Sequence, residues 1–294
     1  MPTHQVQLSP YEIEVTEVTY QQFLAFMNIL GPGSHRNGCG GQPCLQTFTE
    51  SDTSNITLTT TYVVPSVISN HPANNVTWHG AQAYCQALGR RLPTEAEWEF
   101  AARGTDRRVY PWGNLWEATR ANTNRRLDAQ EGTEPVDAYP DGISPFGLFN
   151  MAGNVAEWVQ DWYSPVYYNQ QVSGGVAPVD PTGPAVGQEK VVRGGSWDAV
   201  PFFARTMHRQ VHEPNDPEAW IGFRCAADPQ AAQQPVQALP VVQPTIDLNA
   251  IGAGVPGGTD EETTANSQPT LPPPPTLAPT STLSQPLATL EPGG

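Results

Sequence analysis

Residues 147–158 read GLFNMAGNVAEW, a stretch centred on a glycine turn. Gly153 lies inside a tight turn, where glycine reaches positive φ angles without steric cost. Side chains that carry oxygen crowd this turn, with Asn150 before it and Glu157 after it. A stretch of this kind is usually a hydrogen-bonded loop, so its spacing predicts irregular backbone and does not by itself identify a ligand.

Three helices and a few short strands surround this turn. A capping box at Thr19 predicts a helix through residues 20–27, and a second capping box at Thr94 predicts a helix that ends at Gly104. An apolar face predicts a further helix over residues 77–88. Strands are expected at 5–8, 12–15 and 191–193. Together with many loops that carry tryptophan, these elements predict an irregular α+β domain with little regular secondary structure.

The composition excludes several classes of function. The chain has 294 residues, a formal charge of −15 and only 14 basic residues, of which Lys190 is the sole lysine. A basic surface for nucleic acid is therefore not expected. No run of about 18 apolar residues is present, so no membrane span is predicted. The first residues lack the apolar core of a signal peptide, so none is predicted in the chain as given.

Two regions differ from the rest of the chain. Residues 229–294 contain no Phe, Tyr, Trp, Lys or Arg and hold 13 of the 31 prolines. Such a segment cannot bury enough apolar surface to offset its chain entropy, so we expect a disordered Pro/Thr-rich tail or linker after a folded body over 1–228. Within that body, residues 31–70 are Gly-rich and polar and are expected to be a loop insertion at the surface.

Two pairs of side chains have spacings that metal sites also use. Cys39 and Cys44 have only His35 nearby as a further soft ligand, so a local disulfide is favoured over a metal site. His208 and His212 have the i,i+4 spacing of a helical metal pair, but two partly exposed imidazoles are the favoured interpretation. No nucleophile elbow, P-loop or dinucleotide fingerprint occurs, and no catalytic residue is assigned.

Oxygen ligands are better represented than soft ligands. Calcium takes six to eight oxygens and accepts backbone carbonyls. Two groups of residues offer such oxygens to a hard cation: Asn122, Thr123, Asp128 and Gln130 in the first, and Asn150, Gly153, Val155 and Glu157 in the second.

Six motifs in order resemble the formylglycine-generating enzyme (sulfatase-modifying factor) family over about residues 4–228. They are EVTEVT (14–19), RLPTEAEWE (91–99), YPWG (110–113), GLFNMAGNVAEW (147–158), RGGSW (193–197) and GFRCA (222–226). The resemblance implies the family's C-type-lectin-like fold, which agrees with the α+β prediction. It also implies two structural calcium sites, formed by the two groups of oxygen ligands, and a disulfide between Cys85 and Cys225. Two disulfides imply an extracytoplasmic location.

The same resemblance argues against the family's oxidase chemistry in this chain. Family enzymes oxidise a peptide cysteine with oxygen and a copper(I) ion, which two cysteines hold in the loop after the Gly-Gly-Ser-aromatic motif. Ala199 stands where the first of these cysteines is expected, and no cysteine lies between Trp197 and Arg224. Ala156 stands where the enzymes carry a tryptophan, whereas Ser196 matches an active-site serine. Thiolates suit Cu(I), so copper is not expected here.

Two hypotheses for function follow. The first is a pseudoenzyme that acts as a binding or scaffold domain for a protein or peptide ligand. The alternative is an enzyme of the same family with altered oxidative chemistry, either formylglycine generation or oxidation of the non-haem-iron type. The sequence indicates neither the ligand nor the oligomeric state.

Overall fold

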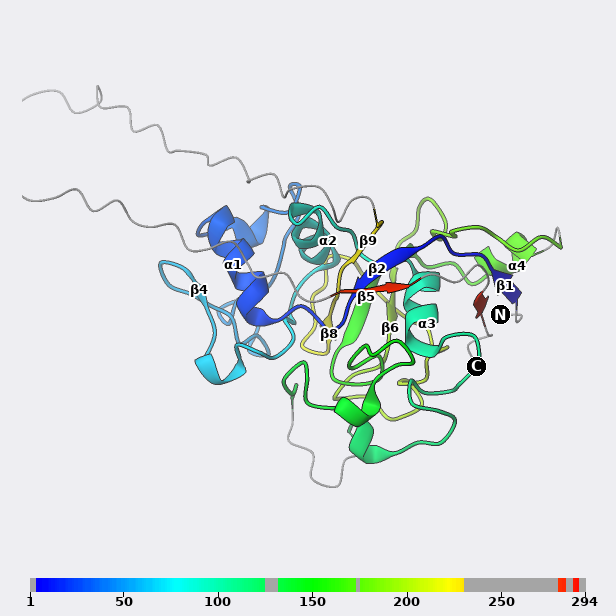
Figure 1. Ribbon diagram of the computed structural model, residues 1–294. Helices are drawn as coiled ribbons and strands as arrows, with labels where there is room; N and C mark the ends of the chain where they lie inside the picture. Colours follow the sequence, from blue (N-terminus) through cyan, green and yellow to red (C-terminus); the bar gives the residue numbers. More distant parts are fainter. Residues whose placement is uncertain (1–3, 125–131, 173–174, 230–279, 284–287, 291–294) are drawn as a thin grey trace, which may run out of the picture.

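The computed structural model describes residues 4–124, 132–172, 175–229, 280–283 and 288–290. The three predicted helices are confirmed as α1 (Tyr20–Leu30), α2 (Trp78–Ala87) and α3 (Glu95–Arg103) (Figure 1). Thr19 and Thr94 each form the expected capping box. A short fourth helix, α4 (Tyr167–Val172), was not predicted. Within the described residues, no helix is long and apolar enough to cross a membrane.

The central sheet has four strands in the order β7-β6-β5-β8. Its longest strand is β5 (Ala156–Trp162), which pairs antiparallel with β6 (Lys190–Arg193) and parallel with β8 (Ile221–Gly222). The strand β7 (Gln210–His212) pairs with the other edge of β6. The sequence missed β5 because it is buried on both faces for most of its length, so apolar and polar residues do not alternate along it.

Short strands connect the two ends of the folded body. The strand β2 (Tyr11–Glu14) pairs with β9 (Ala226–Ala227). Separately, the insertion contains a hairpin of β3 (Thr57–Leu58) and β4 (Tyr62–Val63). Four 3₁₀ turns complete the elements: Ser34–Arg36, Ser66–Ile68, Ala118–Arg120 and Pro140–Gly142.

The structure differs from the expectation of a disordered tail at two short segments. Strand β10 (Thr280–Leu283) pairs with β2, and β11 (Ala288–Leu290) pairs with β1 (His4–Val6). The edge of a strand offers unpaired N–H and C=O groups, which an extended segment can pair with whatever its side chains. Composition therefore could not reveal this pairing. The rest of the expected tail beyond Pro229 lies outside the described residues.

The insertion over residues 31–70 is more than a surface loop. Ile56 is fully buried and Tyr62 nearly so, and both belong to the hydrophobic cluster that contains α1 and α2. Both expected disulfides are confirmed. Cys39–Cys44 closes the insertion, and Cys85–Cys225 joins α2 to the last motif, with Cα atoms 5.4 and 5.6 Å apart. A second hydrophobic cluster surrounds Trp98 on α3.

Buried ion pairs fix β6 against α3. Arg193, at the end of β6, lies 3.0 Å from a Glu95 oxygen and 2.6 Å from a Glu99 oxygen. All three side chains are at most 2% exposed. Arg209 also pairs with Glu95. A buried charge is costly unless it is paired, so these contacts hold the end of β6 in one place. The loop that follows Arg193 therefore starts from a fixed position.

Candidate functional site: a pocket beside the Gly194–Trp197 loop

Two glycines turn the chain sharply after β6. Gly194 and Gly195 have φ angles of +98° and +68°, which side-chain-bearing residues rarely adopt. A Cβ atom on Gly195 would lie 2.8 Å from the backbone nitrogen of Ala204, so only glycine lets the loop fold back so closely. Trp197 N–H then donates to the Asn154 carbonyl at 2.8 Å. The RGGSW motif is thus joined to the GLFNMAGNVAEW turn.

A cavity of ≈ 240 Å³ opens beside this loop. We call it the loop pocket, and its walls are formed by Asn124, Ser196, Asp198, Ala199, Val200, Phe203, Gln210 and Trp220. Asn124 closes one side, because its Nδ2 donates to the Asp198 carbonyl at 3.0 Å and its N–H donates to the Ala199 carbonyl at 3.3 Å. The walls combine hydroxyl, carboxylate and amide groups with aromatic rings.

Gln210, which lines the loop pocket, carries a side-chain atom without a partner. Its side-chain oxygen Oε1 is buried and has no hydrogen-bond partner. Leaving a buried acceptor unpaired costs about 1–3 kcal/mol, so a ligand that donates a hydrogen bond here would recover that cost. The Gln210 side chain is therefore a feature of the pocket that favours binding.

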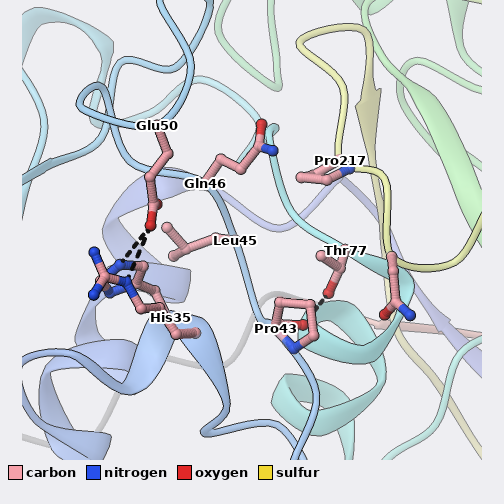
Figure 2. A pocket seen from close by; sticks show the side chains of 9 residues that line it. His35, Pro43, Leu45, Gln46, Glu50, Thr77 and Pro217 are labelled. Carbon is pink, nitrogen blue, oxygen red and sulfur yellow. Dashed lines mark hydrogen bonds and ion pairs between the residues drawn. The ribbon is translucent and has the colours of Figure 1, made fainter.

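A larger cavity, of ≈ 340 Å³, lies between the insertion and the segment before β8 (Figure 2). Several of its polar side chains already have hydrogen-bond partners. His35 Nε2 lies 3.1 Å from Glu50, and Thr77 Oγ1 donates to the Pro43 carbonyl at 2.6 Å. Figure 2 shows these pairs on either side of Leu45, with Pro217 on the segment that leads to β8. We interpret this cavity as structural because none of its described lining side chains has a buried atom without a hydrogen-bond partner.

A third cavity, of ≈ 390 Å³, is lined by Arg91 and Glu97 among others. The Arg91 guanidinium binds both Glu97 oxygens at 2.7 Å and also Asp228 at 2.8 Å. Among the residues that the structure describes around these three cavities, a lining side chain with an unpartnered buried atom occurs only at the loop pocket. The loop pocket is the smallest of the three cavities, and it is the one whose lining residues include an unpaired polar atom.

The loop pocket contains two of the positions that the family resemblance places at the active site. Ala199, at the position expected for the first copper cysteine, lines the pocket together with Ser196. The chain has four cysteines and all of them are in the two disulfides. No thiol sulfur is thus available as a copper ligand, and no lining residue is a histidine. Ala156 is fully buried within β5.

The first group of expected calcium ligands is only partly described. Asn122 is 2% exposed and donates through Nδ2 to the Gly132 carbonyl at 2.9 Å. Thr123 is fully buried, and its hydroxyl has no hydrogen-bond partner. Asp128 and Gln130 lie outside the described residues. The unpartnered Thr123 hydroxyl is a buried oxygen that a cation could use.

The second group surrounds a carboxylate that sequence spacing did not indicate. Glu17 is fully buried, and its two oxygens accept from Nδ2 of Asn150 at 2.9 Å and of Asn154 at 3.0 Å. Burial raises the pKa of Glu17 to about 8, with Arg224 lowering it and Glu157 raising it further. Asn150 Oδ1 is also buried without a partner. The second group of expected ligands thus contains one buried oxygen without a hydrogen-bond partner, that of Asn150.

The remaining members of the second group have structural contacts of their own. Glu157 binds the Arg224 guanidinium at 2.7 and 2.8 Å and accepts from Trp98 Nε1 at 2.8 Å. Val155 is fully buried. A Cβ atom on Gly153 would lie 2.4 Å from the Asn122 carbonyl oxygen, so the two groups of expected ligands are packed directly against each other.

The two histidines with helical spacing do not form a helical pair. His212 ends strand β7, and the His208 ring contacts Phe202 and Phe203 with ring centres 5.0 and 4.9 Å apart. Both histidines are half-buried, as expected. His212 instead lies beside Asp216, with Nε2 3.3 Å from Oδ2. The neighbour of His212 at i+4 is therefore an acid, Asp216, which the spacing of the two histidines did not indicate.

The fold and the loop pocket define a domain of the formylglycine-generating enzyme type. Residues 1–229 match the family described as the sulfatase-modifying factor enzyme 1-like domain, and the chain belongs to this family. It is 34% identical to the formylglycine-generating enzyme of Streptomyces coelicolor over 263 residues, covering 77% of this chain and 81% of that protein. It is also 36% identical over 171 residues to the inactive Cα-formylglycine-generating enzyme 2 of Mus musculus, covering 53% of this chain and 49% of that protein.

Among solved structures, Treponema denticola variable protein 1 matches with a TM-score of 0.57 and 27% identity, over 77% of this chain and 87% of that one. The family and its irregular α+β fold are thereby confirmed. Because relatives include proteins named as enzymes and one named as inactive, membership alone does not decide whether this chain is catalytic.

Proposed function

We propose that this domain binds a peptide ligand through the loop pocket and does not catalyse copper-dependent cysteine oxidation. The observation that carries the proposal is the lining of the loop pocket, which keeps a ligand-sized cavity at the family's catalytic loop but holds Ala199 and no cysteine or histidine. Copper(I) needs soft ligands, and the pocket offers oxygen atoms and hydrocarbon instead. Such a pocket can still bind a ligand, although it cannot support copper-dependent oxidation.

The chemical class of the ligand is inferred from the residues that line the loop pocket. Gln210 Oε1 and the Asp198 carboxylate are hydrogen-bond acceptors, and the Trp220 and Phe203 rings can receive a cation on their faces. The tail holds five acids and no base, so −10 of the net −15 falls on residues 1–228. A basic side chain on a peptide, such as arginine, complements both the acceptors and this charge.

The domain is further proposed to hold structural calcium and to work in an oxidising, extracytoplasmic compartment. The buried oxygens of Thr123, Asn150 and Glu17 support the calcium proposal, and the two disulfides support the compartment. Calcium binding to the folded state alone raises the melting temperature by mass action. A melting temperature that does not change between chelator and millimolar calcium contradicts the calcium proposal.

The binding proposal is tested with a labelled Cys-x-Pro-x-Arg peptide and the same peptide with Gln in place of Arg. Fluorescence anisotropy should show tighter binding of the arginine peptide. Gln210→Leu should weaken that binding about 10-fold, since it removes one acceptor that the ligand would pair. The matched control is Gln46→Leu, because Gln46 lines the cavity of Figure 2 and should leave binding unchanged.

Activity is measured on the same peptide. After incubation with copper, reductant and air, mass spectrometry should find the cysteine intact. Conversion to the aldehyde with more than one turnover per protein overturns the proposal. Equal effects of Gln210→Leu and Gln46→Leu, or no preference for the arginine peptide, contradict the assignment of the ligand to the loop pocket.

A further inference from the structure

Three side chains of types that bind metals lie close together at the end of β7 and in the segment that leads to β8. They are His212, Asp216 and Glu218, and one ligand atom of each lies within 4.8 Å of the other two. His212 Nε2 is 3.3 Å from Asp216 Oδ2 and 4.0 Å from Glu218 Oε1. Neither the first nor the second group of expected calcium ligands contains any of these residues, so the cluster is separate from both.

His212 Nε2 is unsatisfied in this arrangement. The atom is buried and makes no hydrogen bond, although two carboxylates lie close to it. The imidazole is held in place by rings of Trp158 and Trp220, whose centres lie 5.9 and 5.5 Å from that of His212. A buried nitrogen that makes no hydrogen bond costs free energy, which a ligand bound between it and the two nearby carboxylates would remove.

The backbone of the segment is fixed before any ligand binds. The Pro214 carbonyl accepts from Trp78 N–H, and the Glu218 carbonyl accepts from Asn75 N–H, both at 3.0 Å. Pro214 and Pro217 each fix one φ angle. A seven-residue segment therefore presents three ligands with little conformational freedom left to lose, which favours binding.

We propose that His212, Asp216 and Glu218 bind one divalent first-row transition metal, with Zn²⁺ and Co²⁺ preferred over Mg²⁺ and Ca²⁺. Ligand atoms about 2.1 Å from a tetrahedral zinc are about 3.4 Å apart, so small rotations of the two carboxylates complete the geometry. An imidazole ligand favours zinc or cobalt, whereas calcium and magnesium prefer oxygen alone. The Asp216 and Glu218 side chains are 57% and 37% exposed, so metal and its remaining water ligand can enter from solvent.

The metal would fix a segment whose residues contribute to the walls of two cavities. Asn215 and Pro217, on either side of Asp216, line the cavity of Figure 2, and Trp220 lines the loop pocket. Metal binding therefore couples to the position of Trp220. The site itself does not require that the loop pocket bind a peptide, so the two proposals can fail separately.

The test uses the full chain, stripped with chelator and then held in millimolar calcium so that oxygen-only sites are filled. Calorimetry with Zn²⁺ should give one equivalent bound, and Co²⁺ should quench tryptophan fluorescence through its proximity to Trp158 and Trp220. Loss of a ligand should weaken binding at least about 100-fold, since changes even to outer-shell partners cost 10–100-fold. The variants are His212→Gln and Asp216→Asn.

Glu213→Gln is the matched control, because Glu213 lies in the same segment, is exposed, and loses the same charge as Asp216→Asn. It should bind Zn²⁺ as the unchanged chain does. Asp216 is mostly exposed, so Asp216→Asn should fold normally, which the metal-free melting temperature checks. Absence of stoichiometric Zn²⁺ binding overturns the proposal. Equal weakening by Glu213→Gln and Asp216→Asn also overturns it, since that result indicates diffuse attraction of cations to acidic residues.

Discussion

Removing each disulfide separately tests how the chain is stabilised. Cys85–Cys225 closes a loop with a sequence separation of 140, whereas Cys39–Cys44 closes one of only 5. In the chain-entropy treatment, a cross-link stabilises by restricting the unfolded chain, and the effect grows with the logarithm of loop length. The long loop gives about 5 kcal/mol and the short loop about 2 kcal/mol. The double Cys→Ala variants should therefore differ by about 3 kcal/mol in the free energy of unfolding.

The comparison is controlled by the burial of the four cysteines. All are at most 4% exposed, so each double variant loses two buried sulfur atoms and leaves a similar cavity cost. What differs is the length of chain that becomes free in the unfolded state. A 3 kcal/mol difference corresponds to about 6–12 °C in melting temperature for a domain of this size.

The assay is guanidinium unfolding of both double variants and of the unchanged chain, followed by tryptophan fluorescence. Expected stability falls in the order unchanged chain, Cys39→Ala/Cys44→Ala, Cys85→Ala/Cys225→Ala. Equal stability of the two double variants would refute the reasoning, as would a lower stability of the short-loop variant. Either result would mean that native-state packing, and not unfolded-chain entropy, determines how much each disulfide contributes to the free energy of unfolding.

Three further predictions concern single side chains. In chelator, the free energy of unfolding should fall as pH rises from about 5 to 8, because Glu17 has a pKa of about 8 when folded and near 4.5 when unfolded. Glu17→Gln should reduce this slope in unfolding curves at several pH values, and an unchanged slope would contradict the assignment. Arg224→Met should cost about 3–5 kcal/mol by leaving the buried Glu157 carboxylate unpaired, and Glu157→Gln should restore part of the loss in a double-mutant cycle. Ala199→Cys should leave the melting temperature nearly unchanged and create no aldehyde-forming activity, because copper(I) still lacks a second thiolate.

The parts of the fold that could be predicted are those decided within a few residues. The Thr94 side chain and Glu97, three positions later, cap each other, so α3 could be located without knowledge of the rest of the chain. Glu17 shows the opposite case. Its partner Asn150 is 133 residues away, and nothing in the spacing of either motif indicates that they meet. The Cys85–Cys225 bridge spans a similar distance and was predicted through the family resemblance, not through spacing.

The candidate site shows the same division. The RGGSW loop was recognised through the family resemblance, and the structure shows that its backbone requires glycine, whereas the unpartnered atom of Gln210 depends on how β7 lies beside that loop. The His212 cluster was missed because i,i+4 spacing was tested only against a helix. In the structure, His212 ends a strand and its i+4 neighbour is Asp216, brought close by a turn. Spacing rules identify a ligand set only when the local backbone is already known.

The residues that hold this fold and those that perform the family's oxidation are different sets. Arg193 and its acidic partners on α3 fix the start of the loop, and Gly195 fixes its reversal. Ala199, at the position expected for a copper cysteine, takes part in neither the ion pairs nor the glycine turn and lies half-buried at the pocket wall. A cysteine or an alanine at that position leaves the ion pairs and the turn intact. The cavity can therefore persist while its chemistry changes, since the ion pairs and the glycine turn that fix the start of the loop lie outside the pocket lining.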